Sequence, residues 1–161
     1  MRVGFGYDVH PLKKKRLLIL GGVTIPFEKG VQGHSDADVL LHAIGDAILG
    51  AAALGDLGKH FPDTDPAYAN FSSLLLLREI NTLLNKHGYS VVNVDSTIVI
   101  ERPKIAPHIE SMRKNIAECL QIEVDAVSVK ATTSEGMSFI GKGAGVAVHA
   151  VALISRIHET S

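Results

Sequence analysis

The stretch GVAVHAVALI, residues 145–154, constrains the fold most, because almost every position in it is apolar. A short run of this kind, rich in β-branched residues, is typical of a strand that is buried on both faces of a sheet. Helices of the same chain are expected on one face, so a second subunit is the natural cover for the other. The stretch therefore predicts a central sheet and oligomerisation at its open face.

The remaining pattern predicts an α+β fold, a mixed β-sheet with helices packed on one face. Two strand-like segments, 2–10 and 17–26, are expected to pair as a hairpin. Apolar residues at helical spacing predict helices at 35–54, 72–88 and 106–122, with Ser35 or Asp36 as the first N-cap. Strands are predicted at 89–100 and 126–133. The Gly-, Pro- and Asp-rich residues 55–68 predict a functional loop without regular structure.

Composition bounds the function. The 161 residues predict one domain, 1–161, and the net charge of −1 argues against a nucleic-acid partner. Cys119 is the lone cysteine, which excludes a disulfide framework and a thiolate zinc cluster. No apolar run approaches a membrane span, and no signal-peptide pattern precedes the first strand. A cytoplasmic location is expected, or a plastid one where a transit peptide has been removed.

The N-terminal sequence YDVH places Asp8 and His10 two residues apart. In a strand both side chains point to one face, about 6.6 Å apart along the strand, a separation that one zinc ion can bridge. His42, in the first predicted helix, would complete a three-ligand Asp/His/His site of the catalytic type, with Asp46 at i+4 placed to orient its ring. The alternatives are a solvated strand end and a buried helical histidine.

Other polar clusters fit phosphate and hydroxyl binding. His34 lies just before the first helix, where N-terminal amides favour an anion. Asp56, Asp63 and Asp65 suit hydroxyl groups or a cation, but also simple turn capping. In KATTSEGMSF, the hydroxyls before Glu135 suit phosphate oxygens with Mg²⁺ on the carboxylate, or a capped turn. The segment 136–143 matches a phosphate-binding loop only in part, because a strand, not a helix, follows it.

Four stretches spread over the chain resemble the 2-C-methyl-D-erythritol 2,4-cyclodiphosphate synthase family of the non-mevalonate isoprenoid pathway. They are GYDVHPL, GHSDADVLLHAIGDAILGAAALGDLGKHFPDTDP, NVDSTIVIERPKIAPHI and VKATTSEGMSFIGKGAG. The resemblance implies a lyase-type cyclisation of 4-diphosphocytidyl-2-C-methyl-D-erythritol 2-phosphate with release of CMP. It also implies a homotrimer with active sites between adjacent subunits, each taking a small cytidine diphosphate substrate, with no nucleic-acid or membrane partner.

The resemblance carries roles onto particular residues. It implies Zn²⁺ on Asp8, His10 and His42, Mg²⁺ or Mn²⁺ on Glu135, and transition-state stabilisation by His34 and Thr133. The substrate contacts that it implies lie in five stretches of the chain and at two single positions. These are Asp8, Val9 and His10; His34 and Ser35; Asp56, Leu57, Gly58, Phe61, Pro62, Asp63, Thr64 and Asp65; Ile100, Glu101, Arg102, Pro103, Lys104, Ile105 and Ala106; Thr132, Thr133, Ser134 and Glu135; Phe139 and Lys142.

This chain departs from the family pattern in its glycine-rich segment, where Lys142 and Ala144 stand at positions often held by Arg and Glu. Lysine keeps the charge but loses bidentate phosphate geometry, so the isoprenoid-diphosphate binding of some relatives is not carried over. Two other functions are alternatives to the cyclase interpretation. They are a zinc phosphohydrolase with the same ligands, and a trimeric nucleotide or isoprenoid-diphosphate binder with structural zinc.

Overall fold

The computed structural model describes residues 1–157, in which a five-stranded mixed sheet has the strand order β4-β1-β7-β5-β6. All neighbouring strands are antiparallel except β5 and β6. The strands are β1 (Arg2–Lys14), β4 (Lys29–Val31), β5 (Tyr89–Val99), β6 (Val127–Thr132) and β7 (Gly145–Arg156), with β2 (Leu18–Leu20) and β3 (Val23–Ile25) forming a separate hairpin.

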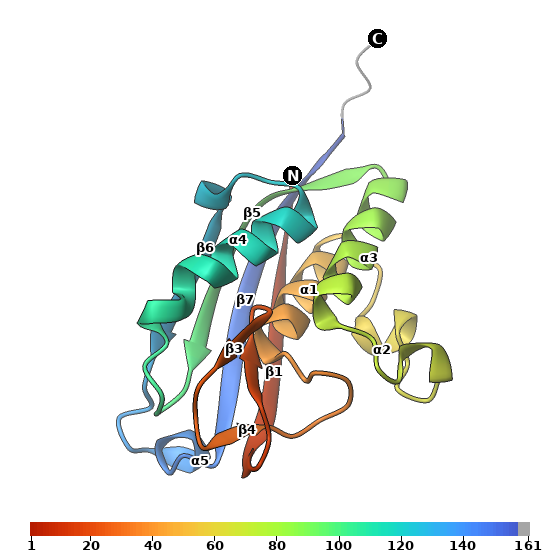
Figure 1. The fold of residues 1–161 in the computed structure, drawn as a ribbon. Coiled ribbons are helices and arrows are strands. Elements are labelled where there is room, and N and C mark those ends of the chain that lie inside the picture. Colours follow the sequence, from red (N-terminus) through yellow and green to blue (C-terminus); the bar gives the residue numbers. More distant parts are fainter. Residues whose placement is uncertain (158–161) are drawn as a thin grey trace.

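Three long helices lie on one face of the sheet (Figure 1). They are α1 (Val39–Ala51), α3 (Ser73–Lys86) and α4 (Ile109–Leu120). The short helices are α2 (Leu57–His60), α5 (Ser138–Gly141) and the 3₁₀ turns η1 (Pro66–Tyr68), η2 (Ala106–His108) and η3 (Val124–Ala126). The predicted α+β class with helices on one face is confirmed. Along residues 1–157, no helix combines the length and hydrophobicity that crossing a bilayer requires.

Several local predictions were wrong. Segment 17–26 does not pair with the first strand, because Gly21 and Gly22 both have positive φ and form the two-residue turn of the β2–β3 hairpin. The first helix begins after Asp38, whose carboxylate accepts the Leu41 N–H, and not at Ser35 or Asp36. The predicted irregular loop 55–68 contains α2 and η1, each capped by an aspartate.

Within the chain, helices cover β7 on one face only. Val146, Val148 and Ala150 are buried under the helices, whereas Val151 on the opposite face is 42% exposed. The same face of β1 carries Val3, Phe5 and Tyr7, and the Phe5 side chain is 61% exposed. The chain therefore leaves an apolar sheet face open, on the side away from the helices.

Close packing of α1 on β1 depends on two glycines. Gly4 and Gly6 lie on the covered face of β1, where a Cβ would approach the Ala47 and Ala43 carbonyl oxygens, respectively, to 1.9 Å. Because no real side chain fits at such a distance, the helix backbone can lie this close only above glycine. The next residues on the same face are Asp8 and His10, so this contact sets how near α1 comes to them.

We predict that Gly6→Ala lowers the free energy of unfolding by at least about 2 kcal/mol, because α1 must move away from the sheet. Urea denaturation measures the change. Gly50→Ala is the matched control, since a Cβ at Gly50 would have its nearest neighbour 3.9 Å away. In this helix position alanine should stabilise by about 0.5 kcal/mol. Equal stability of Gly6→Ala and the wild type would contradict the proposed packing constraint.

Candidate metal centre

Two elements bring an acid and two imidazoles together at one point. Asp8 and His10 point to the helix side of β1, and His42 points toward them from the first turn of α1. Asp8 Oδ2 lies 3.3 Å from His10 Nε2 and 3.4 Å from His42 Nδ1. The three side chains are each about a quarter exposed or less, at 22%, 26% and 20%. The predicted Asp/His/His cluster is therefore present in the fold.

The hydrogen-bond partners of the cluster leave lone pairs facing its centre. His10 Nδ1 lies 2.9 Å from the Gln32 carbonyl oxygen, which can only accept, so His10 carries its proton there and turns a bare Nε2 inward. Asp8 Oδ2 is buried and has no hydrogen-bond partner. Convergent lone pairs of a carboxylate and imidazoles fit a divalent cation with nitrogen and oxygen ligands, zinc among them.

The charges of the cluster reinforce one another in the metal-free protein. Burial raises the pKa of Asp8, but the adjacent His10 and His42 outweigh this effect and hold it to about 2. The Asp8 carboxylate raises the pKa of His10 above the ordinary 6.5. Burial lowers the pKa of His42, and the adjacent Asp8 carboxylate more than offsets that. The site thus holds a fixed negative charge beside two bases that attract protons or a cation.

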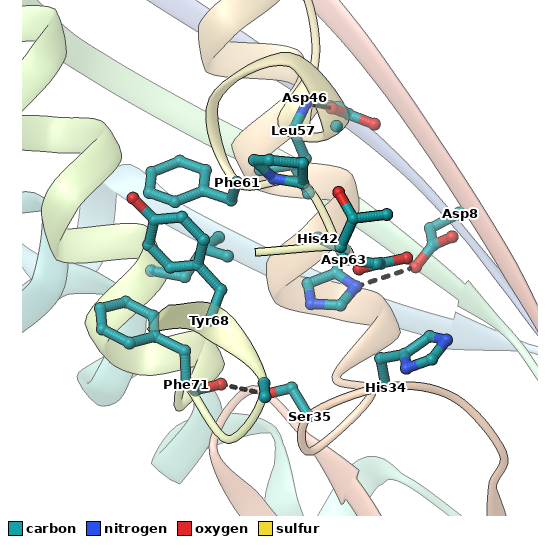
Figure 2. A pocket seen from close by; sticks show the side chains of 15 residues that line it. Asp8, His34, Ser35, His42, Asp46, Leu57, Phe61, Asp63, Tyr68 and Phe71 are labelled. Atoms are coloured by element: carbon teal, nitrogen blue, oxygen red, sulfur yellow. Dashed lines mark hydrogen bonds and ion pairs between the residues drawn. The ribbon is translucent and has the colours of Figure 1, made fainter. Parts of the chain in front are cut away.

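The cluster opens into a pocket of about 440 Å³ (Figure 2). Phe61, Tyr68 and Phe71 gather on one side of it in successive edge-on contacts, with ring centroids 5.3 and 5.5 Å apart, and the imidazoles and acids lie on the other side. Eight predicted contact residues line this pocket besides Asp8 and His42. They are His34, Ser35, Leu57, Gly58, Phe61, Pro62, Asp63 and Thr64. Sequence reasoning missed Tyr68 and Phe71, although aromatic residues in a polar loop are a usable signal.

The predicted partner of His42 was wrong. Asp46 Oδ1 accepts the Leu57 N–H at 2.9 Å and so anchors the start of α2. The His42 ring instead has Nε2 3.0 Å from the Ser73 hydroxyl at the start of α3. Residues 42 and 46 share a helix face, but the helix packing turns the histidine toward α3. Burial also raises the pKa of Asp46, with the charge of Asp56 adding to the effect.

Two acids of the 55–68 segment have capping roles in the chain. Asp56 accepts the Lys59 N–H at 3.0 Å as the N-cap of α2, and Asp65 accepts the Ala67 N–H at 2.9 Å as the N-cap of η1. Asp63 is exposed and lines the pocket. Val9 alternates to the other face of β1, so only its backbone is on the side of the cluster.

A second group of predicted residues lies in a different place. A pocket of about 220 Å³ is lined by Ile100, Glu101, Pro103, Lys104, Ile105, Ala106, Thr132 and Thr133, together with Ala131. Both Glu101 carboxylate oxygens hold the following turn, accepting the Ser134 N–H at 3.1 Å and the Gly136 N–H at 3.3 Å. No residue lines both this pocket and the one beside His42. Over residues 1–157, one chain does not bring the two groups together.

The remaining predicted residues do not line this second pocket. Glu135 is exposed, with a φ of 52° and its N–H 3.3 Å from the Thr133 hydroxyl. Phe139 packs over Gly145 at the start of β7. Arg102 and Lys142 line a smaller cavity of about 200 Å³ together with Lys29.

The fold and the cluster define the class of this protein as an α+β protein with a candidate divalent-metal centre at the mouth of a pocket. The chain belongs to the YgbB family, whose model matches residues 1–155. It is 62% identical over 157 residues to the 2-C-methyl-D-erythritol 2,4-cyclodiphosphate synthase of Chloroherpeton thalassium, covering 98% of this chain and 100% of that protein.

Solved structures agree with the sequence comparison. A 2C-methyl-D-erythritol-2,4-cyclodiphosphate synthase in its CDP-bound form superposes with a TM-score of 0.89 at 34% identity, over 96% of this chain and 100% of the other. The bifunctional IspDF of Campylobacter jejuni gives a TM-score of 0.95 at 38% identity, over 99% of this chain and 43% of that one.

We predict that zinc affinity falls as the pH drops below the raised pKa values of His10 and His42, which lie above 6.5. Protons then compete with the metal for the inward-facing nitrogens, while Asp8 stays ionised. Competition with a zinc-binding dye across about pH 5 to 8, the range in which histidine changes charge, measures the effect. An affinity independent of pH over this range would show that the imidazoles are not ligands.

Proposed function

We infer that this protein converts 4-diphosphocytidyl-2-C-methyl-D-erythritol 2-phosphate to 2-C-methyl-D-erythritol 2,4-cyclodiphosphate with release of CMP. The reaction is the cyclisation step of the non-mevalonate isoprenoid pathway, and the enzyme is a phosphorus–oxygen lyase. The observation that carries this conclusion is the Asp8, His10 and His42 cluster, in a chain 62% identical over its length to a synthase of this name. The CDP-bound relative supports a cytidine nucleotide as part of the substrate.

The reaction is an intramolecular phosphoryl transfer. An oxygen of the 2-phosphate forms a bond to the diphosphate phosphorus nearer the methylerythritol, and the bond from that phosphorus to the CMP oxygen breaks. The nucleophile is already anionic, so no general base is required. The protein has to supply proximity and charge neutralisation. The described pockets fit these needs, because they offer donors and cation ligands around a cavity large enough for a phosphorylated polyol.

Two metals are proposed, Zn²⁺ held by Asp8, His10 and His42, and Mg²⁺ or Mn²⁺ held by Glu135. When bound, they supply Lewis-acid polarisation and neutralise phosphate charge. His34 and Ser35 line the pocket beside the cluster. His34 would donate a hydrogen bond to the 2-phosphate, and Ser35 would contact the same group. Thr133 would donate to the diphosphate from the second pocket. Each donor then stabilises charge that develops as the cyclic product forms.

The rest of the substrate is assigned to segments. We propose that residues 56–58 and 61–65 cover the methylerythritol, with Asp56 and Asp63 on its hydroxyls. Residues 100–106 would hold the cytosine largely through backbone groups, with Lys104 near the phosphates. Thr132 to Glu135 would form the diphosphate turn. Phe139 and Lys142 would add further contacts. The second pocket, lined by most of 100–106 and by Thr132 and Thr133, supports this division.

The separation of the two pockets supports a homotrimer with active sites between adjacent subunits. The strand registers connect Asp8 to Val148, Val148 to Ile98, and Ile98 to Ala131. With strands about 4.8 Å apart, three steps place Asp8 roughly 14 Å from Ala131. The exposed apolar face of β1 and β7 offers a surface for the neighbouring subunits. A site formed by the metal cluster of one subunit and the second pocket of the next would reunite the two groups.

We predict that His42→Ala abolishes CMP release and leaves the fold intact, because the cluster loses one of its three ligands, a side chain that still reaches the surface at 20% exposure. A CMP-release assay with product analysis measures this loss, and circular dichroism checks the fold. Cyclic diphosphate with CMP is expected from the wild type. Linear products containing oxygen from water would instead indicate a phosphohydrolase, and tight CMP binding without turnover would indicate a binding protein.

The shared site makes a quantitative prediction. Mixed trimers of His42→Ala and Thr133→Ala subunits, formed by co-expression in equal amounts, should recover about a quarter of wild-type activity. Each site needs one intact half from each of two subunits, and each half is intact with a probability of about one half. Mixing Asp8→Asn with His42→Ala should restore nothing, since both belong to the same half. No recovery in the first mixture would contradict sites shared between subunits.

A further inference from the structure

Asp36, Ser73 and His42 form a hydrogen-bonded chain behind the metal cluster. Ser73 is 1% exposed, and its hydroxyl lies 3.0 Å from His42 Nε2. The same hydroxyl donates to Asp36 Oδ1, and the Ser73 backbone N–H donates to Asp36 Oδ2 at 3.0 Å. The chain joins the start of α3, at Ser73, to α1 and the loop just before it, which lie more than 30 residues earlier in the sequence.

The direction of this chain follows from its last member. An ionised carboxylate can only accept, so the Ser73 hydroxyl must give its single proton to Asp36. The Ser73 oxygen is then left as an acceptor toward His42, which requires the proton of the neutral imidazole to be on Nε2. In that tautomer, Nδ1 presents its lone pair to Asp8 Oδ2 and the centre of the cluster.

This direction matters because Asp8 acts in the opposite sense. Its carboxylate lies 3.4 Å from His42 Nδ1 and, in the absence of a metal, favours a proton on that nitrogen. A proton on Nδ1 would block metal binding. His10 is held in its binding tautomer by the Gln32 carbonyl, but over the described residues no carbonyl is hydrogen-bonded to His42 Nε2. The Ser73 hydroxyl takes the place of that carbonyl, with its direction set by Asp36.

We propose that Ser73 and Asp36 are positioning residues that hold His42 in the Nε2-protonated tautomer and thereby prepare Nδ1 to bind the metal. The proposal rests on the metal-binding role of His42 proposed above. It also assigns a function to a buried hydroxyl that makes no contact with the pocket: Ser73 does not line it, whereas Ser35, on the same loop as Asp36, does. Conservative changes at these two positions should therefore alter His42 without touching the substrate.

The direct test is nitrogen NMR of the histidine rings in metal-free protein at alkaline pH, where imidazole is neutral. In Ser73→Ala the acceptor for Nε2–H is lost, so Asp8 alone acts and the Nε2-protonated fraction of His42 should fall. Asp36→Asn keeps the shape but brings an amide NH₂. The amide oxygen should take the place of Oδ2, because the Ser73 N–H lies 3.0 Å from that atom whereas the Asp38 N–H lies 3.4 Å from Oδ1. The NH₂ then faces the Ser73 hydroxyl and reverses the chain. This variant should also move the His42 proton toward Nδ1.

The second readout is zinc affinity, measured by competition with a chelator. Loss of a hydrogen-bond partner behind a metal ligand typically weakens binding by about 10- to 100-fold. That range is expected for Ser73→Ala, with Ser73→Thr, which keeps the hydroxyl, recovering most of it. Ser111→Ala and Asp125→Asn, at exposed positions, are matched controls and should leave affinity and tautomer unchanged. Thermal unfolding identifies any variant that fails to fold. If Ser73→Ala does not fold, the tautomer and zinc affinity of the isosteric variant Asp36→Asn provide the test.

The outcomes separate this proposal from the proposed function. A lower melting temperature in Ser73→Ala and Asp36→Asn, with the His42 tautomer and zinc affinity of the wild type, would show a purely structural role and overturn the proposal. A wild type that binds no zinc would overturn the metal centre. The tautomer of the metal-free protein would still report whether Ser73 and Asp36 control His42.

Discussion

The close contact between α1 and β1 is the constraint on which the rest of the site depends. Gly4 and Gly6 give the helix backbone room that any side chain would fill, since a Cβ at either would come within 1.9 Å of a helix carbonyl oxygen. The same strand face continues into Asp8 and His10, and the helix that rests on the glycines carries His42. The packing of α1 on β1 thereby sets the distances among the three candidate metal ligands. Residues with no chemistry of their own set the geometry of the residues that have it.

The hydrogen bonds on the outer side of the cluster favour imidazole tautomers whose inward nitrogens are free to bind a cation. The Gln32 carbonyl takes the outer proton of His10, the Ser73 hydroxyl lies against the outer nitrogen of His42, and Asp8 Oδ2 is buried without a partner. This arrangement suits a cation beside a phosphate better than acid–base catalysis. It agrees with a reaction whose nucleophile is already charged and whose barrier is lowered by proximity and charge neutralisation.

Much of this could be predicted from the sequence where the signal is local and periodic. Period-two alternation placed Asp8 and His10 on one strand face, and helical spacing placed His42 within the first long helix. Predictions failed where a contact between residues distant in sequence determines the hydrogen-bond partner or the helix boundary. Asp46 is at the right helical spacing from His42 but binds Leu57, and Asp38 displaces Ser35 and Asp36 as the helix cap while also holding the turn at Gly21 and Gly22. The separation of the predicted contact residues into two pockets depends on strand order, which no local pattern in the sequence reveals.

A crystal structure of the zinc-loaded protein with CDP tests the proposed arrangement of metal, nucleotide and subunits most directly. Anomalous scattering at the zinc edge should give a peak bound by Asp8 Oδ2, His10 Nε2 and His42 Nδ1. The cytosine should lie against residues 100–106 of the adjacent subunit, with the diphosphate between the cytosine and the zinc. Zinc bound elsewhere, or metal and cytosine held by the same chain, would contradict it.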